Sequence, residues 1–214
     1  MNYSSLQSTV LARLNMSTSD PAAASIASDV NEAIHFIETL APDGWSWARG
    51  VYTFTTTSGT DSYTMSQISA SDTINTILDV KILRQNNYWQ RLDLINPHEA
   101  ELTYPETNTG IPEAFFVDGT TLYLYPSPNG AYTTRVRATK YEPDLSAGAS
   151  SPVMPSVYHS AIVEATLTIV YERLQDTTRL GLAQSRLDQW LQRMRVGQSK
   201  YQGAPRITVR SWDL

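Results

Sequence analysis

The sequence has 214 residues, among them no cysteine and only three histidines. The lack of cysteine excludes disulfides, thiolate metal sites and a cysteine nucleophile, and three histidines leave little material for a metal centre. No apolar run approaches the roughly 18 residues that a membrane-spanning helix needs, so we expect no membrane contact. Because no basic residue precedes Arg13 and no apolar stretch follows Met1, we expect no secretory signal peptide.

Charge is also sparse. Charged residues make up 17% of the chain, with a net charge of −5. Their distribution is uneven: residues 1–172 contain 8 basic and 18 acidic residues, whereas residues 173–214 contain 8 basic and 3 acidic residues. An acidic body with a basic end indicates a binding partner. Hydrophobic residues, at 41%, are numerous enough for a folded core.

Hydrophobic spacing predicts an α+β fold. Between Ile26 and Leu40, apolar residues recur three and four positions apart, as on one face of a helix. Asp118-Gly119 between two apolar runs predicts a β-hairpin, and Ser156 is the expected N-cap of a later helix. We therefore expect N-terminal helices (1–44) and C-terminal helices (146–197) to form one bundle. It would carry an inserted antiparallel β module (45–145) and an extended C-terminal arm (198–214).

Few residues offer catalytic chemistry. Glu32, His35 and Glu38 match half of a di-metal carboxylate site, but no second Glu-x-x-His occurs, and a solvated helix face is the favoured explanation for them. His98 and His159 stand beside carboxylates and serines, respectively, and surface positions explain both. No phosphate-binding glycine motif is present. We predict no catalytic residue, no bound metal and no cofactor, and hence no enzyme.

The basic end is the more informative feature. Four arginines recur six and seven positions apart, which keeps them on one slowly turning helix face: Arg173, Arg179, Arg186 and Arg193. Such a stripe binds nucleic acid or an acidic protein surface. The arm then adds charged and apolar residues typical of a docking segment, able to add a strand to a sheet edge: Lys200, Tyr201, Arg206, Ile207, Val209, Arg210 and Trp212.

Two alternatives follow from these residues. Aromatic side chains of the β module, including Trp45, Trp47 and Trp89, could form a sugar-stacking platform, and spare carboxylates could cleave a glycoside. This alternative is a carbohydrate-binding or hydrolysing tail module, and it requires the aromatics to be exposed. The second alternative is a DNA-binding protein that uses the arginine stripe, with an affinity that falls steeply as salt rises.

The chain also resembles the head-to-tail adaptor (connector) proteins of tailed bacteriophages. The resemblance lies in Trp45-Ser46-Trp47 with Tyr52-Thr53-Phe54 and a Gly59-x-x-x-Tyr63 hairpin. It continues in Leu122-Tyr123-Leu124-Tyr125-Pro126 and in Tyr158-His159 at the start of a long helix. It covers most of the chain.

The resemblance implies a structural protein of the virion neck, synthesised in the host cytoplasm. It implies a homo-oligomeric, dodecameric ring that docks under the portal protein and extends the DNA channel toward a tail or nozzle protein. Genomic DNA would pass through without sequence-specific binding. The arm would embrace the portal, and the β module, larger than in mostly helical adaptors, could meet the tail.

Overall fold

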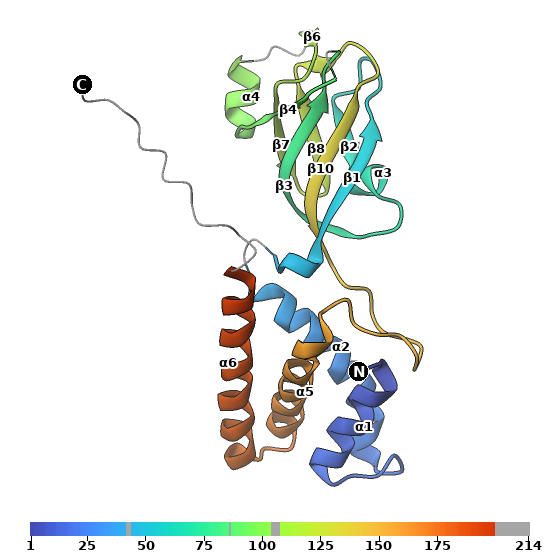
Figure 1. The fold of residues 1–214 in the computed structure, drawn as a ribbon, viewed down its shortest axis with the longest axis vertical. Coiled ribbons are helices and arrows are strands. Elements are labelled where there is room, and N and C mark those ends of the chain that lie inside the picture. Colours follow the sequence, from blue (N-terminus) through green and yellow to red (C-terminus); the bar gives the residue numbers. More distant parts are fainter. Residues whose placement is uncertain (42–43, 86, 104–107, 200–214) are drawn as a thin grey trace, which may run out of the picture. The chain divides into compact units, whose positions relative to one another are not determined.

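The structure is a computed structural model that describes residues 1–41, 44–85, 87–103 and 108–199. It contains two compact units. The first, here called the helical unit, comprises Met1–Ile34 and Ser146–Leu214, and the second, the β unit, comprises His35–Leu145. The division falls inside a helix, and Figure 1 shows long helices in the first unit and the strands, with short helices among them, in the second. The predicted α+β class, with helices before and after a β module, is confirmed.

The helices of the first unit follow the predicted apolar spacing. They are α1 (Tyr3–Leu14), η1 (Pro21–Ser25), α2 (Ile26–Thr39), η3 (Ser156–Tyr158), α5 (His159–Arg173) and α6 (Thr177–Ser199). Helix α1 begins where Asn2 accepts a hydrogen bond from the Ser5 amide, and it ends at Asn15 in the left-handed conformation. The stripe of α2 is buried at Ile26, Val30 and Ile34.

Helix α5 is the centre of the helical unit. Its residues from Ala161 to Leu167 are all buried, as expected of a helix enclosed by neighbours rather than facing solvent. Helix α6 runs beside it (Figure 1). The predicted N-cap at Ser156 is wrong, because Ser156 begins a 3-10 turn and no side chain caps either that turn or α5. Within the described ranges, no helix has the length and apolar content needed to cross a membrane.

Two four-stranded sheets form most of the β unit. The first sheet is antiparallel, in the order β1 (Arg49–Thr55), β10 (Thr133–Lys140), β3 (Ile74–Leu83) and β4 (Trp89–Arg91). The second has the order β2 (Ser62–Thr64), β8 (Thr121–Tyr125), β7 (Ala114–Asp118) and β5 (Asp93–Leu94), in which β5 and β7 are parallel. The remaining elements are η2 (Ser46–Ala48), α3 (Met65–Ile68), α4 (Pro97–Thr103) and the parallel pair β6 (Thr109–Gly110) and β9 (Ser127–Pro128).

The core of the β unit takes buried side chains from both sheets. Val80, Ile82 and Val136 come from the first sheet, and Leu122 and Leu124 come from the second. The hairpin predicted at Asp118-Gly119 is confirmed: β7 pairs with β8 in antiparallel register, and Gly119 has a positive φ of 54°. These alternating apolar residues bring the two sheets together over one core.

The hairpin expected around Gly59 is wrong. The flanking strands β1 and β2 lie in different sheets, β1 beside β10 and β2 beside β8. The turn itself is present, with Gly59 at a φ of 77°. It carries the chain from one sheet to the other because β1 pairs with a strand about eighty residues further on, a partner that local spacing does not reveal.

Two residues that follow α2 are fixed by close packing. The indole Nε1 of Trp45, a residue only 1% exposed, donates a hydrogen bond of 2.8 Å to the carbonyl oxygen of Ile37. That carbonyl lies in the last turn of α2, where helical carbonyls lack intrahelical donors. Gly44 has a φ of 66°, and a Cβ there would lie 2.2 Å from Cγ2 of Thr139. Only glycine fits this position without displacing the buried threonine.

Candidate interaction surfaces

The four arginines of the predicted stripe divide between two helices and two roles. Arg173 is the last residue of α5. Its Nη1 and Nη2 atoms donate to both carboxylate oxygens of Asp29, at 3.0 and 2.6 Å. The Asp29 side chain is 5% exposed, and its hydrogen bonds raise the pKa of the Arg173 guanidinium above the ordinary value. Arg173 therefore joins α5 to α2 inside the helical unit.

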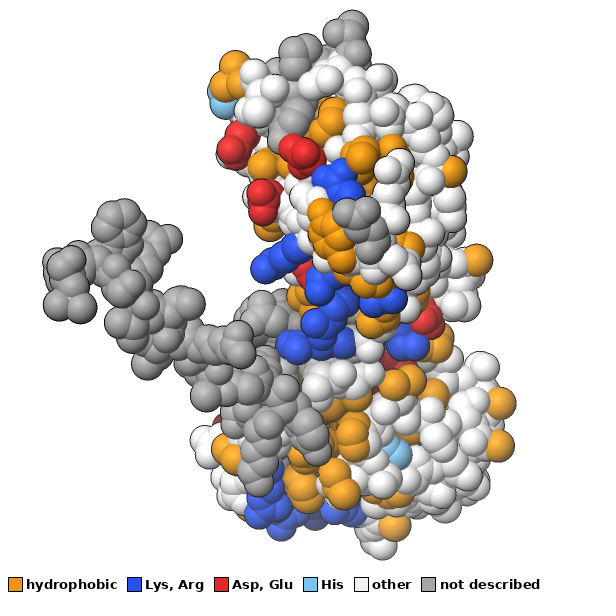
Figure 2. Space-filling model, turned by 45° about the horizontal axis from the view of Figure 1, so that its top comes forward, with side chains coloured by type: hydrophobic (Ala, Val, Ile, Leu, Met, Phe, Trp, Pro, Cys, Tyr) orange, Lys and Arg blue, Asp and Glu red, His pale blue; other side chains and the backbone are white. Residues whose placement is uncertain are grey.

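The other three arginines lie on α6 and are exposed. Arg179 forms an ion pair with Asp176 at 3.4 Å, next to the start of the helix. The guanidinium of Arg193 lies over the Trp190 ring, 4.9 Å from the centroid. A spacing of seven residues turns each arginine by about 20° relative to the last. The helix thus presents a narrow basic face, and Figure 2 shows basic side chains, in blue, on the surface of the helical unit.

A groove of about 420 Å³ lies beside this basic face, between α1, α5 and α6. Arg186 lines one side, and Arg13 forms an ion pair with Glu164 on another. The Glu164 side chain is 4% exposed, and its Oε2 atom has no hydrogen-bond partner in the described part of the chain. The ion pair with Arg13 offsets the cost of burying this carboxylate on the central helix α5.

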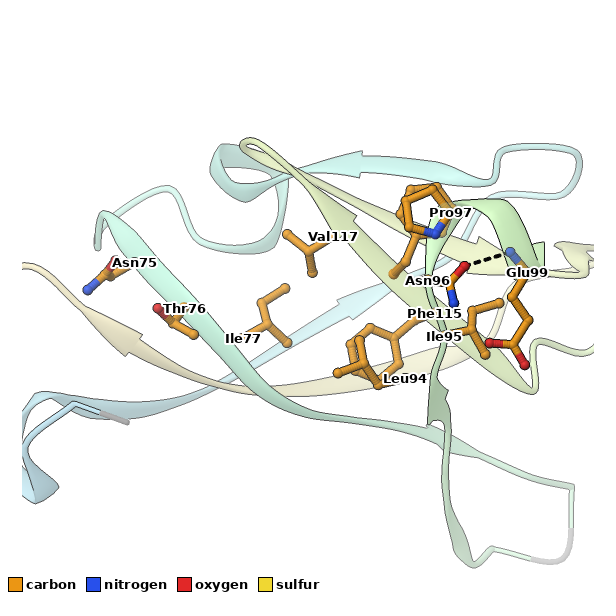
Figure 3. A pocket seen from close by; sticks show the side chains of 11 residues that line it. Asn75, Thr76, Ile77, Leu94, Ile95, Asn96, Pro97, Glu99, Phe115 and Val117 are labelled. Atoms are coloured by element: carbon orange, nitrogen blue, oxygen red, sulfur yellow. Dashed lines mark hydrogen bonds between the residues drawn. The ribbon is translucent and has the colours of Figure 1, made fainter. Parts of the chain in front are cut away.

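A second groove, of about 530 Å³, lies in the β unit. Figure 3 shows Ile77, Leu94 and Val117 in the space between β3 and β7. Leu94 is 71% exposed and Val117 is 37% exposed, so the groove presents apolar side chains to solvent. Glu99 also lines this groove and lies in the first turn of α4, where its amide donates a hydrogen bond of 2.7 Å to Oδ1 of Asn96. The Asn96 side chain thereby caps the N-terminus of α4.

Two of the three histidines have defined partners. His35 Nδ1 lies 3.2 Å from Glu38, and its Nε2 lies 2.8 Å from Asp144. Burial would lower the pKa of His35, but hydrogen bonds to these carboxylates raise it overall. His35 is thus held by an ion-pair network, and no group of three or more potential ligands in the described residues could hold a metal.

His159 is buried, contrary to the predicted surface position. Its Nε2 donates a hydrogen bond of 2.8 Å to the carbonyl oxygen of Met154, and its Nδ1 lies 2.6 Å from the amino group of Met1. Burial, together with the positive amino group, lowers the pKa of His159. The ring is therefore a neutral packing element that ties the start of α5 to the preceding loop.

The tryptophans of the β unit do not form an exposed platform. Trp45 is buried, and Trp47 stacks against it with ring centroids 4.9 Å apart. Trp89 is half-buried, and the Arg135 guanidinium lies 3.9 Å from its ring centroid. One of the three rings is buried and the other two are half-buried with a face against another side chain, which counts against the carbohydrate alternative.

The residues predicted for the arm lie outside the described residues, so their docking role stays a prediction. They are Lys200, Tyr201, Arg206, Ile207, Val209, Arg210 and Trp212. Sequence reasoning missed the β groove, because its open edges depend on which distant strands pair. In the sequence, Val117 is an ordinary member of an apolar run, and no pattern singles out Leu94.

Together these features describe an α+β protein with exposed basic and apolar surfaces. Residues 1–210 match the family model of the SU10 adaptor protein. The chain belongs to the SU10 adaptor protein family, and this membership supports a structural role as an adaptor in a bacteriophage particle. No curated protein matches the chain.

Proposed function

We propose that this protein is the head-to-tail adaptor of a phage neck. Copies form a ring, dodecameric by resemblance, that docks under the portal protein and extends the DNA channel toward a tail or nozzle protein. The observation that carries the proposal is the family match, which spans both units and most of the arm. The protein is made in the host cytoplasm and incorporated into the virion, where its role is structural rather than enzymatic.

The charge distribution supports passage of DNA without binding. Residues 35–145, the β unit, contain 7 basic and 13 acidic residues. A surface with this excess of carboxylates repels phosphates and lacks the cations whose binding would release counterions. DNA can therefore slide past such a surface. The competing DNA-binding function is weakened because Arg173 and Arg179 are already paired with carboxylates.

The portal contact is assigned to the basic face of α6 and the arm. Arg186 and Arg193 are exposed, and no carboxylate pairs with either in the described part of the chain. They would meet an acidic portal surface, because complementary charge steers and orients docking.

Measurement of portal binding tests this assignment. In the double variant Arg186→Gln, Arg193→Gln, affinity for the purified portal should fall roughly tenfold, since each exposed pair contributes up to about 1 kcal/mol. Deletion of residues 198–214 should abolish binding and leave the helical content intact. The matched control is Arg137→Gln, which removes an exposed arginine from the β unit and should bind as the wild type does. Unchanged portal binding by both the deletion and the double variant would contradict the assignment.

A further inference from the structure

The β unit is an incompletely closed pair of sheets. Residues 89–94 pass from one sheet to the other: as β4 they pair with the end of β3, and as β5 they pair with the start of β7. This crossing segment covers only part of the two strands. Beyond it, α4 begins at Pro97 and the chain leaves the sheets.

Both strands therefore keep an uncovered edge. β3 pairs with β4 only through Lys81–Leu83, so its first six residues, 74–79, have no neighbouring strand on that side among the described residues. The carbonyls of Glu113, just before β7, and of Phe115, on β7, accept hydrogen bonds from the amides of Asp93 and Ile95. Because strand residues alternate, Val117 directs its backbone groups to the same edge, past the end of β5.

The apolar groove of Figure 3 lies between these two open edges. Its exposed Leu94 and Val117 supply the apolar contacts, and the edges supply backbone donors and acceptors. Strand addition uses both: main-chain hydrogen bonds for affinity and pockets for alternate side chains for specificity. Glu99, which lines the groove, and Asp118 beside Val117 are both exposed and acidic.

We infer that this groove binds the C-terminal segment Arg206-Ile207-Thr208-Val209-Arg210 of a second copy as an added β-strand. The segment alternates β-branched apolar residues with polar ones and is basic at both ends. Extended, five residues span about 17 Å, comparable with the roughly 20 Å of the six uncovered residues of β3. Its positive charge complements the net −6 of residues 35–145.

Such a contact joins two different surfaces, an arm on one copy and a groove on the next. Interfaces of this head-to-tail kind generate closed rings when the rotation between copies is suitable. The inference therefore rests on the ring of the proposed function, and it specifies the contact between neighbouring subunits of that ring. It also divides the arm: residues 206–210 bind the neighbouring copy, and Lys200, Tyr201 and the face of α6 remain for the portal.

Full-length variants and sedimentation velocity without portal protein test the inference. The wild-type sedimentation coefficient should rise with concentration. Val117→Lys, which places a cation in the groove, and Ile207→Asp, which puts a charge on the apolar face of the segment, should each remain monomeric. The matched controls should associate as the wild type does: Val51→Lys changes a valine that is 60% exposed on the edge strand β1, and Thr208→Asp changes the opposite face of the segment.

Mixing the two deficient variants gives the sharper result. In this mixture the Ile207→Asp chain supplies the only intact groove and the Val117→Lys chain supplies the only intact arm. The two variants should therefore form 1:1 heterodimers and nothing larger. If Val117→Lys unfolds, Leu94→Lys, at a side chain already 71% exposed, takes its place.

Three results would overturn the inference: a wild type that is monomeric at every concentration, a groove variant that associates normally, or a mixture without heterodimers. The last result would arise if each arm filled the groove of its own copy or if another protein were the occupant. A chain that binds the portal but does not self-associate would refute only this inference, whereas the converse result would refute only the proposed function.

Discussion

Replacing Arg173 should lower the stability of the protein more than replacing any other arginine of the stripe, because Arg173 forms an ion pair with a buried carboxylate. Arg173→Gln removes both hydrogen bonds to Asp29 and leaves a carboxylate that is 5% exposed without its cation. Breaking a fully buried ion pair costs about 3–5 kcal/mol. Because the Arg173 side chain is 40% exposed, water can partly replace it, and we expect about 2–3 kcal/mol.

Thermal unfolding followed by circular dichroism measures this loss. For a chain of this size, 1 kcal/mol lowers Tm by about 2–4 °C, so the helical signal should melt about 4–12 °C earlier. Arg193→Gln is the matched control and should stay within about 0.5 kcal/mol of the wild type. In a double-mutant cycle, Asp29→Asn should recover part of the loss, giving a coupling of at least about 0.5 kcal/mol. An Arg173→Gln variant as stable as the wild type, or a cycle without coupling, would refute the reasoning.

Three further predictions concern stability, each checked by unfolding measurements. Gly44→Ala should cost at least about 1 kcal/mol more than Gly119→Ala: both place alanine at a positive φ, but only the first Cβ meets a buried side chain. Equal losses of stability in the two variants would contradict the predicted clash at residue 44. Trp45→Phe should cost about 1–3 kcal/mol, because the smaller ring leaves a cavity at a buried position and the Ile37 carbonyl keeps only the Leu40 amide as a donor. A neutral outcome would argue against the indole hydrogen bond. The pKa of His159 is lowered in the folded protein, so protonating the ring opposes folding. Its contribution to the free energy of unfolding is therefore complete above pH 6.5 and is lost as the pH falls below that value. His159→Gln should remove this part of the acid sensitivity, and an unchanged pH profile would be inconsistent with a buried neutral ring.

Local patterns predicted those parts of the fold that local physics determines. The apolar stripe from Ile26 onward identified α2, and Asp118-Gly119 identified the hairpin of β7 and β8. Both signals arise between residues that are near in sequence. The pairing of β1 with β10 joins residues such as Thr55 and Thr133, and nothing in either segment specifies the other.

The same distinction explains the candidate surfaces. Heptad spacing correctly placed Arg179, Arg186 and Arg193 on one helix, but it could not reveal that Arg173 is paired with Asp29, 144 residues away. Nor could it reveal the groove, which exists because β5 ends before it has covered β7. Sequence spacing reports the periodicity of one element, whereas pairing between elements depends on the whole topology.

The central claim is that copies of this chain form a ring in the phage neck. Imaging the neck of intact particles by electron cryomicroscopy tests it most directly. We expect a closed ring of copies beneath the portal, around a channel that contains DNA. Particles whose neck lacks this chain, or contains it without a ring around the channel, would contradict the account.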